Sequence, residues 1–182
     1  MTQQKQEAFM AAYESCHEPF LRYCSVLAWG RMDTEDLVQD VLLSAYHHFD
    51  RVEDPAQLLH YLIRAARNRS VSAWRRRKVR ERYLAQQARR LEARGVSPEV
   101  QADIHLLYRA IDHLPPRQRE ALVLFEISGF SMKEIAGIQG SSVAAVKTRV
   151  SRGRQRLRQL LTDRVSAPSL DGLLLTLKSL TL

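Results

Sequence analysis

The stretch SMKEIAGIQGSSVAAVKTR, residues 131–149, decides how the second half of the chain folds. Ser131 precedes Glu134 by three residues, which is the spacing of a capping box at the start of a helix. Gly140 suits the turn that must follow, because glycine adopts backbone angles that other residues avoid. Ser142 can then cap a second helix. A cap, a short helix, a turn and a second cap predict a helix-turn-helix.

The helix that begins after Ser142 has two different faces. Small and apolar residues recur at spacings of three and four, so one stripe is expected to pack inward. This stripe consists of Val143, Val146, Val150, Gly153, Leu157 and Leu160. Lys and Arg near the start of such a helix can hold phosphates or read guanine. The residues expected to contact DNA are Ala144, Ala145, Lys147, Thr148, Arg149, Ser151, Arg152 and Arg154. A helical hairpin whose basic face is only solvated is the alternative.

Charge is segregated along the chain, which has 28 Lys+Arg, 20 Asp+Glu and a net charge of +8. Residues 33–54 are acidic, with Arg51 as their one base, whereas residues 64–94 are strongly basic. Residues 142–160 are also basic and include no acid. A chain that needed only solubility would intersperse its signs. The pattern indicates one acidic surface for a protein partner and two basic surfaces for a polyanion.

The remaining chain is typical of an all-α protein, because Gly and Pro are sparse and apolar residues recur at three and four. We expect a helix over 9–27 that Pro19 kinks or splits. A second helix should run over 33–49, capped by Asp33 with Asp36 in the capping-box position. A third should follow the cap Asp54, begin at Pro55 and end in the run 74–78.

The apolar pattern thins over 79–104, where Gly95, Ser97 and Pro98 interrupt it, and we interpret this segment as a linker. A short helix over 105–113 and another from Pro116 to Phe125, stopped by Gly129, should precede the helix-turn-helix. The end of the chain, 162–182, is rich in leucine and predicts a short amphipathic helix. This helix either covers its own domain or binds a regulator.

Several classes of protein are excluded. The longest apolar runs, LVLF at 122–125 and LLL at 173–175, are far shorter than the roughly 20 residues that span a bilayer. The N-terminus lacks the pattern of a secretory signal, so we expect a cytoplasmic protein without membrane insertion. No metal-ligand spacing, nucleophile–base set or phosphate-binding glycine loop is present, and we expect no enzyme, cofactor or metal. Cys16 and Cys24 are interpreted as buried thiols, with a redox sensor as the alternative.

Four motifs occur in the order typical of one family. They are DTEDLVQDVL at 33–42, IRAARN at 63–68 leading to RRR at 75–77, LPPRQRE at 114–120, and the helix-turn-helix. Together they resemble a bacterial RNA polymerase sigma factor of the extracytoplasmic-function class. The resemblance implies two small helical domains joined by a linker: region 2 over 8–78, the linker over 79–104 and region 4 over 105–161. The tail 162–182 extends beyond the usual end of the class.

The resemblance also implies partners and residue roles. Core RNA polymerase would be held through its beta-prime coiled coil and beta flap, promoter DNA would be bound, and an anti-sigma factor is implied. The expected polymerase-docking residues are Glu35, Asp36, Gln39 and Asp40, although acids near a helix start also favour the helix dipole. The expected minus-ten residues are Arg64, Arg67, Asn68, Arg69, Ser72, Trp74, Arg75 and Arg76. Among them, Asn68 is the expected base-reading residue.

Within these roles, three alternatives stay open. Trp74 suits a helix end as well as base stacking, and the run 75–78 suits a solvated helix end. Ala144-Ala145 stands where the family usually has a glycine-threonine pair, so the promoter sequence is open.

The expected function is promoter-specific initiation by reading the minus-thirty-five element and stabilising the melted minus-ten element. Rival hypotheses are a dimeric helix-turn-helix regulator and an interaction module that uses the leucine-rich tail.

Overall fold

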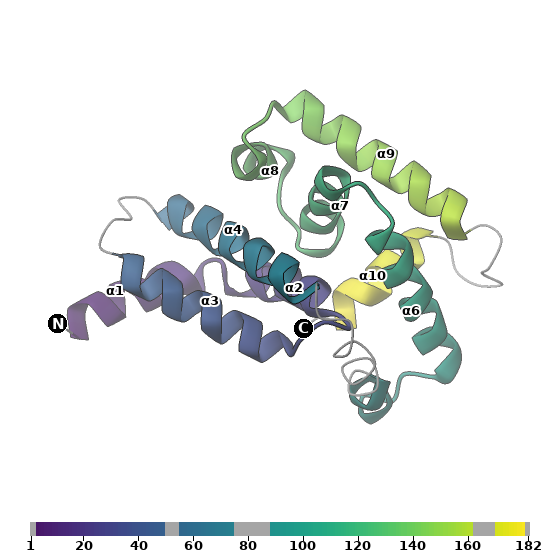
Figure 1. Cartoon of the computed structure of the whole chain (residues 1–182), viewed down its shortest axis with the longest axis horizontal. Coiled ribbons are helices and arrows are strands. Elements are labelled where there is room, and N and C mark those ends of the chain that lie inside the picture. Colours follow the sequence, from purple (N-terminus) through teal and green to yellow (C-terminus); the bar gives the residue numbers. More distant parts are fainter. Residues whose placement is uncertain (1–2, 50–54, 75–87, 162–169, 181–182) are drawn as a thin grey trace. The chain divides into compact units, whose positions relative to one another are not determined.

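The computed structural model describes residues 3–49, 55–74, 88–161 and 170–180. Helices and turns account for these ranges, and no strand occurs within them, which confirms the all-α prediction. The chain divides into two compact units, Met1–Tyr83 and Leu84–Leu182 (Figure 1). Among the described helices, none is long and apolar enough to cross a membrane.

The first unit is a helical bundle arranged around α4. Its helices are α1 (Gln3–Glu14), α2 (His17–Ala28), α3 (Thr34–His48) and α4 (Pro55–Trp74). The helix α4 packs against each of the other three, and α2 also packs against α3. The largest fully buried side chains of this core are Phe20, Tyr23, Leu37, Leu58, Leu62 and Ile63.

The predicted split of the first helix is confirmed, and it falls before the proline. The helix α1 ends at Glu14, and Pro19 is the third residue of α2. A proline ring clashes with the carbonyl four residues earlier, here that of Ser15, so a continuous helix cannot pass through this position. In the first turn of a new helix the backbone N–H groups have no partner within the helix. The N–H that proline lacks is therefore not missed there. Cys16 precedes this turn, and its carbonyl accepts from the Phe20 N–H at 3.0 Å.

The helix α3 begins as predicted. The Asp33 carboxylate accepts from the Glu35 N–H at 2.8 Å and caps the helix. Its inward side buries Leu37, Val38, Val41 and Ala45. The helix α4 begins at Pro55, and its predicted cap Asp54 lies outside the described residues.

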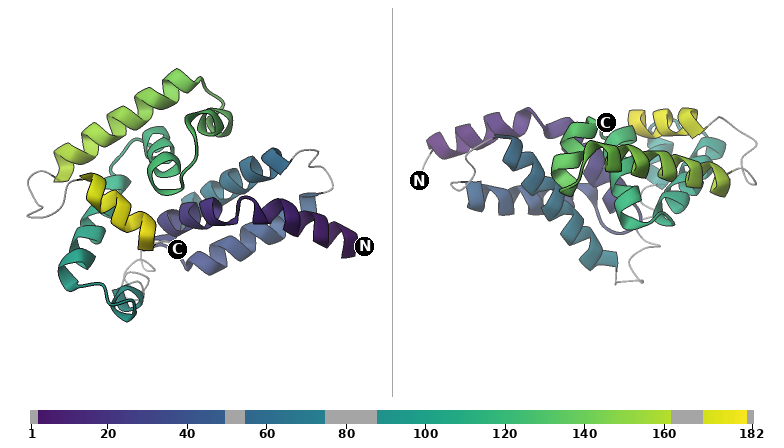
Figure 2. Two further views of the ribbon diagram at one scale, coloured as in Figure 1. Left: turned by 180° about the vertical axis from the view of Figure 1, so that it is seen from behind. Right: turned by 90° about the horizontal axis from the view of Figure 1, so that it is seen from above.

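The second unit contains the predicted helix-turn-helix. After a helical turn at 88–93 come α6 (Pro98–Asp112), α7 (Pro116–Leu122), the π-helix η3 (Val123–Ile127), α8 (Met132–Gln139), α9 (Val143–Leu161) and α10 (Leu170–Leu180). The helix α9 packs on α6, α7 and α8. Figure 2 shows α8 and α9 meeting at a tight turn. Fully buried side chains include Ile104, Leu107, Ile111, Leu122, Leu124 and Leu157.

Three details of this unit differ from the sequence prediction. The helix expected over 105–113 begins at Pro98, because Ser97 caps it by accepting from the Val100 N–H at 3.5 Å. A Ser-Pro pair can mark the start of a helix as well as a break between helices. Val143 is 39% exposed because it is the first residue of α9, ahead of the packed turns. Leu160 is only half-buried, and its neighbour Leu161 continues the inward stripe in its place.

Candidate nucleic-acid interface

The turn between α8 and α9 is fixed by caps on both helices. Ser131 and Glu134 form the predicted capping box, in which each side chain accepts from the other residue's N–H. Gly140 has φ 57° and ψ 51°, the left-handed conformation that favours glycine. The Ser142 hydroxyl then accepts from the Ala145 N–H at 3.2 Å. The first turn of α9 therefore has a defined direction.

A polar network below this turn was not predicted. The guanidinium of Arg149 donates to Oε1 of Gln139 at 2.6 Å and to the Ser141 hydroxyl at 2.7 Å. The Gln139 amide in turn donates to a Glu120 carboxylate oxygen at 2.9 Å and to the Arg117 carbonyl at 3.1 Å. Gln139 and Glu120 are both buried. The network ties α9 through the turn to α7, so Arg149 is bonded within the unit.

The packing of α9 on α7 is close at one glycine. A Cβ built at Gly153 would lie 2.9 Å from Cδ1 of Leu122, which is itself fully buried. Val146, Val150, Gly153 and Leu157 are buried, as predicted. The opposite face leaves Ala144, Lys147, Thr148, Ser151 and Arg152 exposed and Ala145 half-buried.

Arg154, like Arg149, is bonded within the unit. Its Nε donates to Oε1 of Glu126 at 2.6 Å, and its NH2 group donates to Oε2 at 3.0 Å, so the pair is bidentate. The Glu126 side chain is only 11% exposed. These hydrogen bonds to Glu126 raise the pKa of Arg154 above its ordinary value, which keeps the guanidinium charged. Arg154 thus joins α9 to η3.

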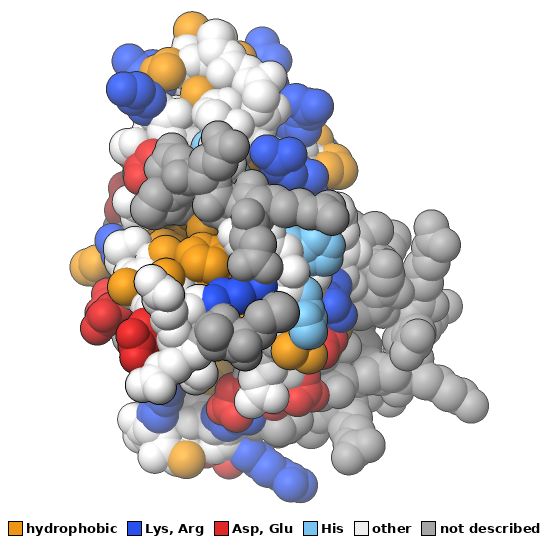
Figure 3. Space-filling view, turned by 90° about the vertical axis from the view of Figure 1, so that its left-hand side faces the viewer, with side chains coloured by type: hydrophobic (Ala, Val, Ile, Leu, Met, Phe, Trp, Pro, Cys, Tyr) orange, Lys and Arg blue, Asp and Glu red, His pale blue; other side chains and the backbone are white. Residues whose placement is uncertain are grey.

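In the first unit, the exposed side of α4 borders a hollow. His48, Gln57, His60, Tyr61, Arg64, Ala65 and Asn68 line it. The Tyr61 hydroxyl is 2.9 Å from the Ser44 hydroxyl, and His48 is bonded to the Ser44 carbonyl at 2.8 Å. Arg64 and Asn68 are exposed one helical turn apart. Figure 3 shows histidine side chains gathered on one face of the molecule.

Comparison with known proteins bears on both units. Residues 12–80 match the family description Sigma-70 region 2, and residues 104–157 match Sigma-70, region 4. The chain is 35% identical over 148 residues to the ECF RNA polymerase sigma factor EcfG of Rhodopseudomonas palustris (strain TIE-1), covering 79% of this chain and 80% of that protein. The chain belongs to the ECF sigma factors. It therefore acts with core RNA polymerase in promoter-directed initiation.

Two solved structures are similar to this sigma factor. One is CnrH in complex with the cytosolic domain of CnrY, at a TM-score of 0.61 and 27% identity, covering 88% of this chain and 91% of that one. The other is the sigma factor RpoE in complex with the anti-sigma factor NepR from Bartonella quintana. Its TM-score is 0.58 at 26% identity, and the match covers 90% of this chain and all of that one.

The sigma factor's other predicted site residues occupy varied positions. Arg69 is exposed and pairs with Asp40 of α3, with 2.7 Å between NH1 and Oδ2, whereas Arg67 is half-buried. Glu35, Asp36, Gln39 and Asp40 are all exposed at the start of α3. Trp74 ends α4, and the side chains of Ser72 and Trp74 lie outside the described residues, as do Arg75 and Arg76.

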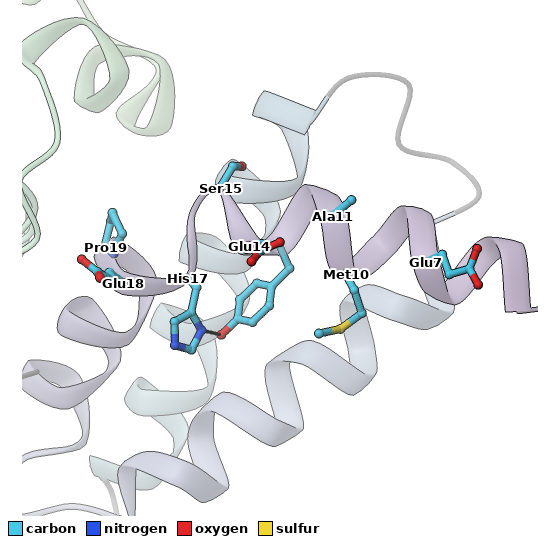
Figure 4. A pocket seen from close by; sticks show the side chains of 9 residues that line it. Glu7, Met10, Ala11, Glu14, Ser15, His17, Glu18 and Pro19 are labelled. Carbon is cyan, nitrogen blue, oxygen red and sulfur yellow. Dashed lines mark hydrogen bonds between the residues drawn. The ribbon is translucent and has the colours of Figure 1, made fainter.

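The two cysteines of this sigma factor lie inside the first unit. Burial raises the pKa of the Cys16 thiol to about 11 and also raises that of Cys24. Cys16 lies at the break between α1 and α2. Other residues near this break, among them Glu14, His17 and Pro19, line a hollow (Figure 4). The imidazole of His17 is bonded there to the Tyr13 hydroxyl at 2.9 Å. Both thiols are neutral at physiological pH, which suits a structural role.

Proposed function

We propose that the outer face of α9 reads the minus-thirty-five element of the promoter. The observation that carries this assignment is the capped turn, because its caps and the Arg149 network fix the start of α9 on α8 and α7. Small residues at Ala144 and Ala145 permit close approach to base edges. Lys147, Thr148, Ser151 and Arg152 then lie on one exposed face, where cations and hydroxyls suit phosphates and bases. Because Arg154 is bonded to Glu126, we leave it out of the proposed contact set.

Arg149 takes a positioning role in this proposal. Its guanidinium already bonds Gln139 and Ser141, so it orients the turn, and any DNA contact would use its remaining donors. Replacing Arg149 should therefore weaken binding to every promoter rather than change the preferred sequence.

We propose that the exposed side of α4 holds the melted minus-ten strand. Asn68 offers an amide for base edges, and Arg64 offers a cation for the strand backbone. The hollow beside them contains Tyr61 and two histidines, whose rings can stack on an unpaired base. Arg67, Arg69, Ser72, Trp74, Arg75 and Arg76 remain the further members of this proposed site.

We propose that the start of α3 docks on the beta-prime coiled coil of core polymerase. Glu35, Asp36 and Gln39 are all exposed there, and complementary charge gives register and association rate. Asp40 contributes while it also pairs with Arg69. The sigma factor has no catalytic role of its own in this proposal and works in the cytoplasm. An anti-sigma partner is proposed because the similar sigma factor RpoE was solved in complex with the anti-sigma factor NepR.

Run-off transcription with purified core polymerase and a promoter library tests the assignment. Arg152→Ala should reduce minus-thirty-five binding and lower the salt slope of binding by about one, the change for one lost phosphate contact. Arg158→Ala, which removes one charge from the last turns of the same helix, is the control. Specific DNA binding by the free protein, together with no initiation from any template, would instead support a stand-alone regulator.

Asn68→Ala should impair open-complex formation while leaving core binding unchanged. Gln6→Ala removes an exposed amide from α1, outside the hollow, and serves as its control. For polymerase docking, Glu35→Lys with Asp36→Lys should weaken core binding, most strongly at low salt. Two exposed acids of α1 provide the matched double reversal, Glu7→Lys with Glu14→Lys, which should leave core binding intact.

A further inference from the structure

Gln139, the last residue of α8, lies between a buried acid of α7 and an arginine of α9. Its Nε2 donates to the Glu120 carboxylate at 2.9 Å and to the Arg117 carbonyl at 3.1 Å, and its Oε1 accepts from Nη1 of Arg149 at 2.6 Å. A carboxylate only accepts and a guanidinium only donates, so one orientation of the amide satisfies both neighbours. This single side chain links α7, α8 and α9 (Figure 1).

Apolar packing holds α9 along most of its length. Val146, Val150 and Leu157 are buried on its inner side, and Gly153 lies close against Leu122 of α7. The polar network lies instead where α9 begins, beside the turn that precedes the proposed DNA-contacting face. Its position therefore suits control of this end of the helix more than support of the whole core.

The bonds of Arg149 leave one edge of its guanidinium available. Nη1 carries two hydrogens, and it donates to Gln139 and, at 2.7 Å, to the Ser141 hydroxyl. Among the described residues, no hydrogen bond or ion pair engages Nε or Nη2 of Arg149. The N–H groups of Nε and Nη2 form a parallel fork, which matches the geometry of two phosphate oxygens.

Arg149 also borders the outer face of α9. Ala145 precedes it by four positions and Arg152 follows it by three, so the three residues lie along one side of the helix. Arg152 is exposed, and Ala145 and Arg149 are half-buried. Helical side chains lean toward the N-terminus of their helix, so Arg149 extends past the small Ala145 toward the turn. A DNA strand that approaches Ala145 would meet the guanidinium there.

We propose that Gln139 is a positioning residue for promoter binding: it holds Arg149 so that the Nε–Nη2 edge binds one backbone phosphate of the minus-thirty-five element. This inference rests on the proposed reading role of α9. Without Gln139, Arg149 keeps its charge and loses its fixed direction, so its ordering on DNA costs affinity. A phosphate contact carries no sequence information, so the preferred bases stay the same.

The test measures binding of the holoenzyme, formed from core polymerase and the full chain, to a promoter duplex. Each phosphate of the minus-thirty-five element is replaced in turn by an uncharged methylphosphonate. Gln139→Met removes the amide and keeps an unbranched side chain of similar length. Gln101→Met is the matched control, because Gln101 is a buried amide of α6 that donates to the Val96 carbonyl at 2.8 Å. Both substitutions remove a buried hydrogen-bonded amide, so both should lower Tm.

We expect Gln139→Met to weaken holoenzyme binding by about tenfold, the low end of the range for a hydrogen bond to a charged group. One methylphosphonate position should weaken wild-type binding and have far less effect on Gln139→Met and on Arg149→Ala. Gln101→Met should match the wild type at every position. Ser141→Ala removes the other acceptor of Arg149 and should show a smaller change at the same phosphate. This variant decides the question if Gln139→Met does not fold.

Arg152→Ala separates this inference from the proposed role of α9. If Arg152→Ala weakens binding while Gln139→Met and Ser141→Ala do not, the positioning role is wrong and α9 remains the reading helix. If none of the three weakens binding, the proposed role of α9 is wrong and this inference falls with it. Weaker binding by Gln139→Met with an undiminished effect of every methylphosphonate, or with a changed base preference, would overturn the phosphate assignment.

Discussion

The two helices proposed to contact DNA, α9 and α4, hold their basic residues in different ways. On α9, Arg149 is bonded to the turn and Arg154 to Glu126, so two of its cations serve the fold. On α4, Arg64 is exposed and Arg69 makes a cross-helix pair at the surface. A run of bases in the sequence therefore does not by itself tell how many of them are available to a polyanion. Neighbouring acids and amides decide that number.

The largest expected effect breaks the packing that supports α9. Gly153→Val places a branched side chain against Leu122, where a Cβ alone would approach within 2.9 Å. Overpacking of a filled core costs about 1–3 kcal/mol, which exceeds the few tenths of a kcal/mol that valine gains over glycine in helix propensity. Thermal unfolding should show a marked fall in Tm. Gln155→Val, at an exposed position of the same helix, should change Tm little.

The next effect tests whether Arg154 serves the fold. Arg154→Ala leaves the Glu126 carboxylate without its bidentate partner, at a cost of about 1–2 kcal/mol after allowance for the partly exposed guanidinium. Denaturant unfolding should show this loss, whereas Arg156→Ala, at an exposed position, should cost less than about 0.5 kcal/mol. Combining Arg154→Met with Glu126→Gln should recover part of the stability. If Arg154→Ala and Arg156→Ala lowered the free energy of unfolding equally, Arg154 would not serve the fold. The difference between α9 and α4 would then disappear.

The surface pair of α4 should matter much less. A double-mutant cycle of Arg69→Ala and Asp40→Ala should give a coupling below about 1 kcal/mol, because both side chains are solvated. High salt should reduce it further. A coupling as large as that of Arg154 with Glu126 would show that the first unit also uses its cations for stability.

The smallest expected effect at neutral pH concerns the thiols of the first unit. An unfolded thiol ionises near a pKa of about 8.5, whereas burial raises the pKa of Cys16 to about 11. The thiols' contribution to the free energy of unfolding is therefore constant below that unfolded pKa and falls as the pH rises toward 11. Iodoacetamide at pH 8 should label the native protein far more slowly than the protein in guanidinium. Fast native labelling would favour the redox-sensor hypothesis.

The helix-turn-helix was predictable because its signals are local. Ser131 with Glu134, Gly140 and Ser142 each act within a few residues of the chain, and the structure has all three features. The start of α6 was missed because Ser97-Pro98 is compatible with both a break and a helix start. The Ser97 cap and the burial of Ile104 show that the pair is a helix start here.

The polar network was not predictable, because its members are far apart in sequence. Gln139 meets Glu120 across 19 positions, and Arg154 meets Glu126 across 28. The one sequence signal for this network was the presence of polar residues at positions of α7 and α8 that otherwise face inward. The role of the leucine-rich tail was open for the same reason, since its spacing shows an apolar face and does not identify what covers that face.

The π-helix at Val123–Ile127 sets the rotational phase between two parts of the second unit. An α-helix turns by about 100° per residue, so inserting or deleting one residue here would rotate everything downstream by that angle about the helix axis. Glu126 would then point away from Arg154, and α8 would leave the inner side of α9. The number of residues in this one turn therefore keeps α9 in phase with the helices that support it.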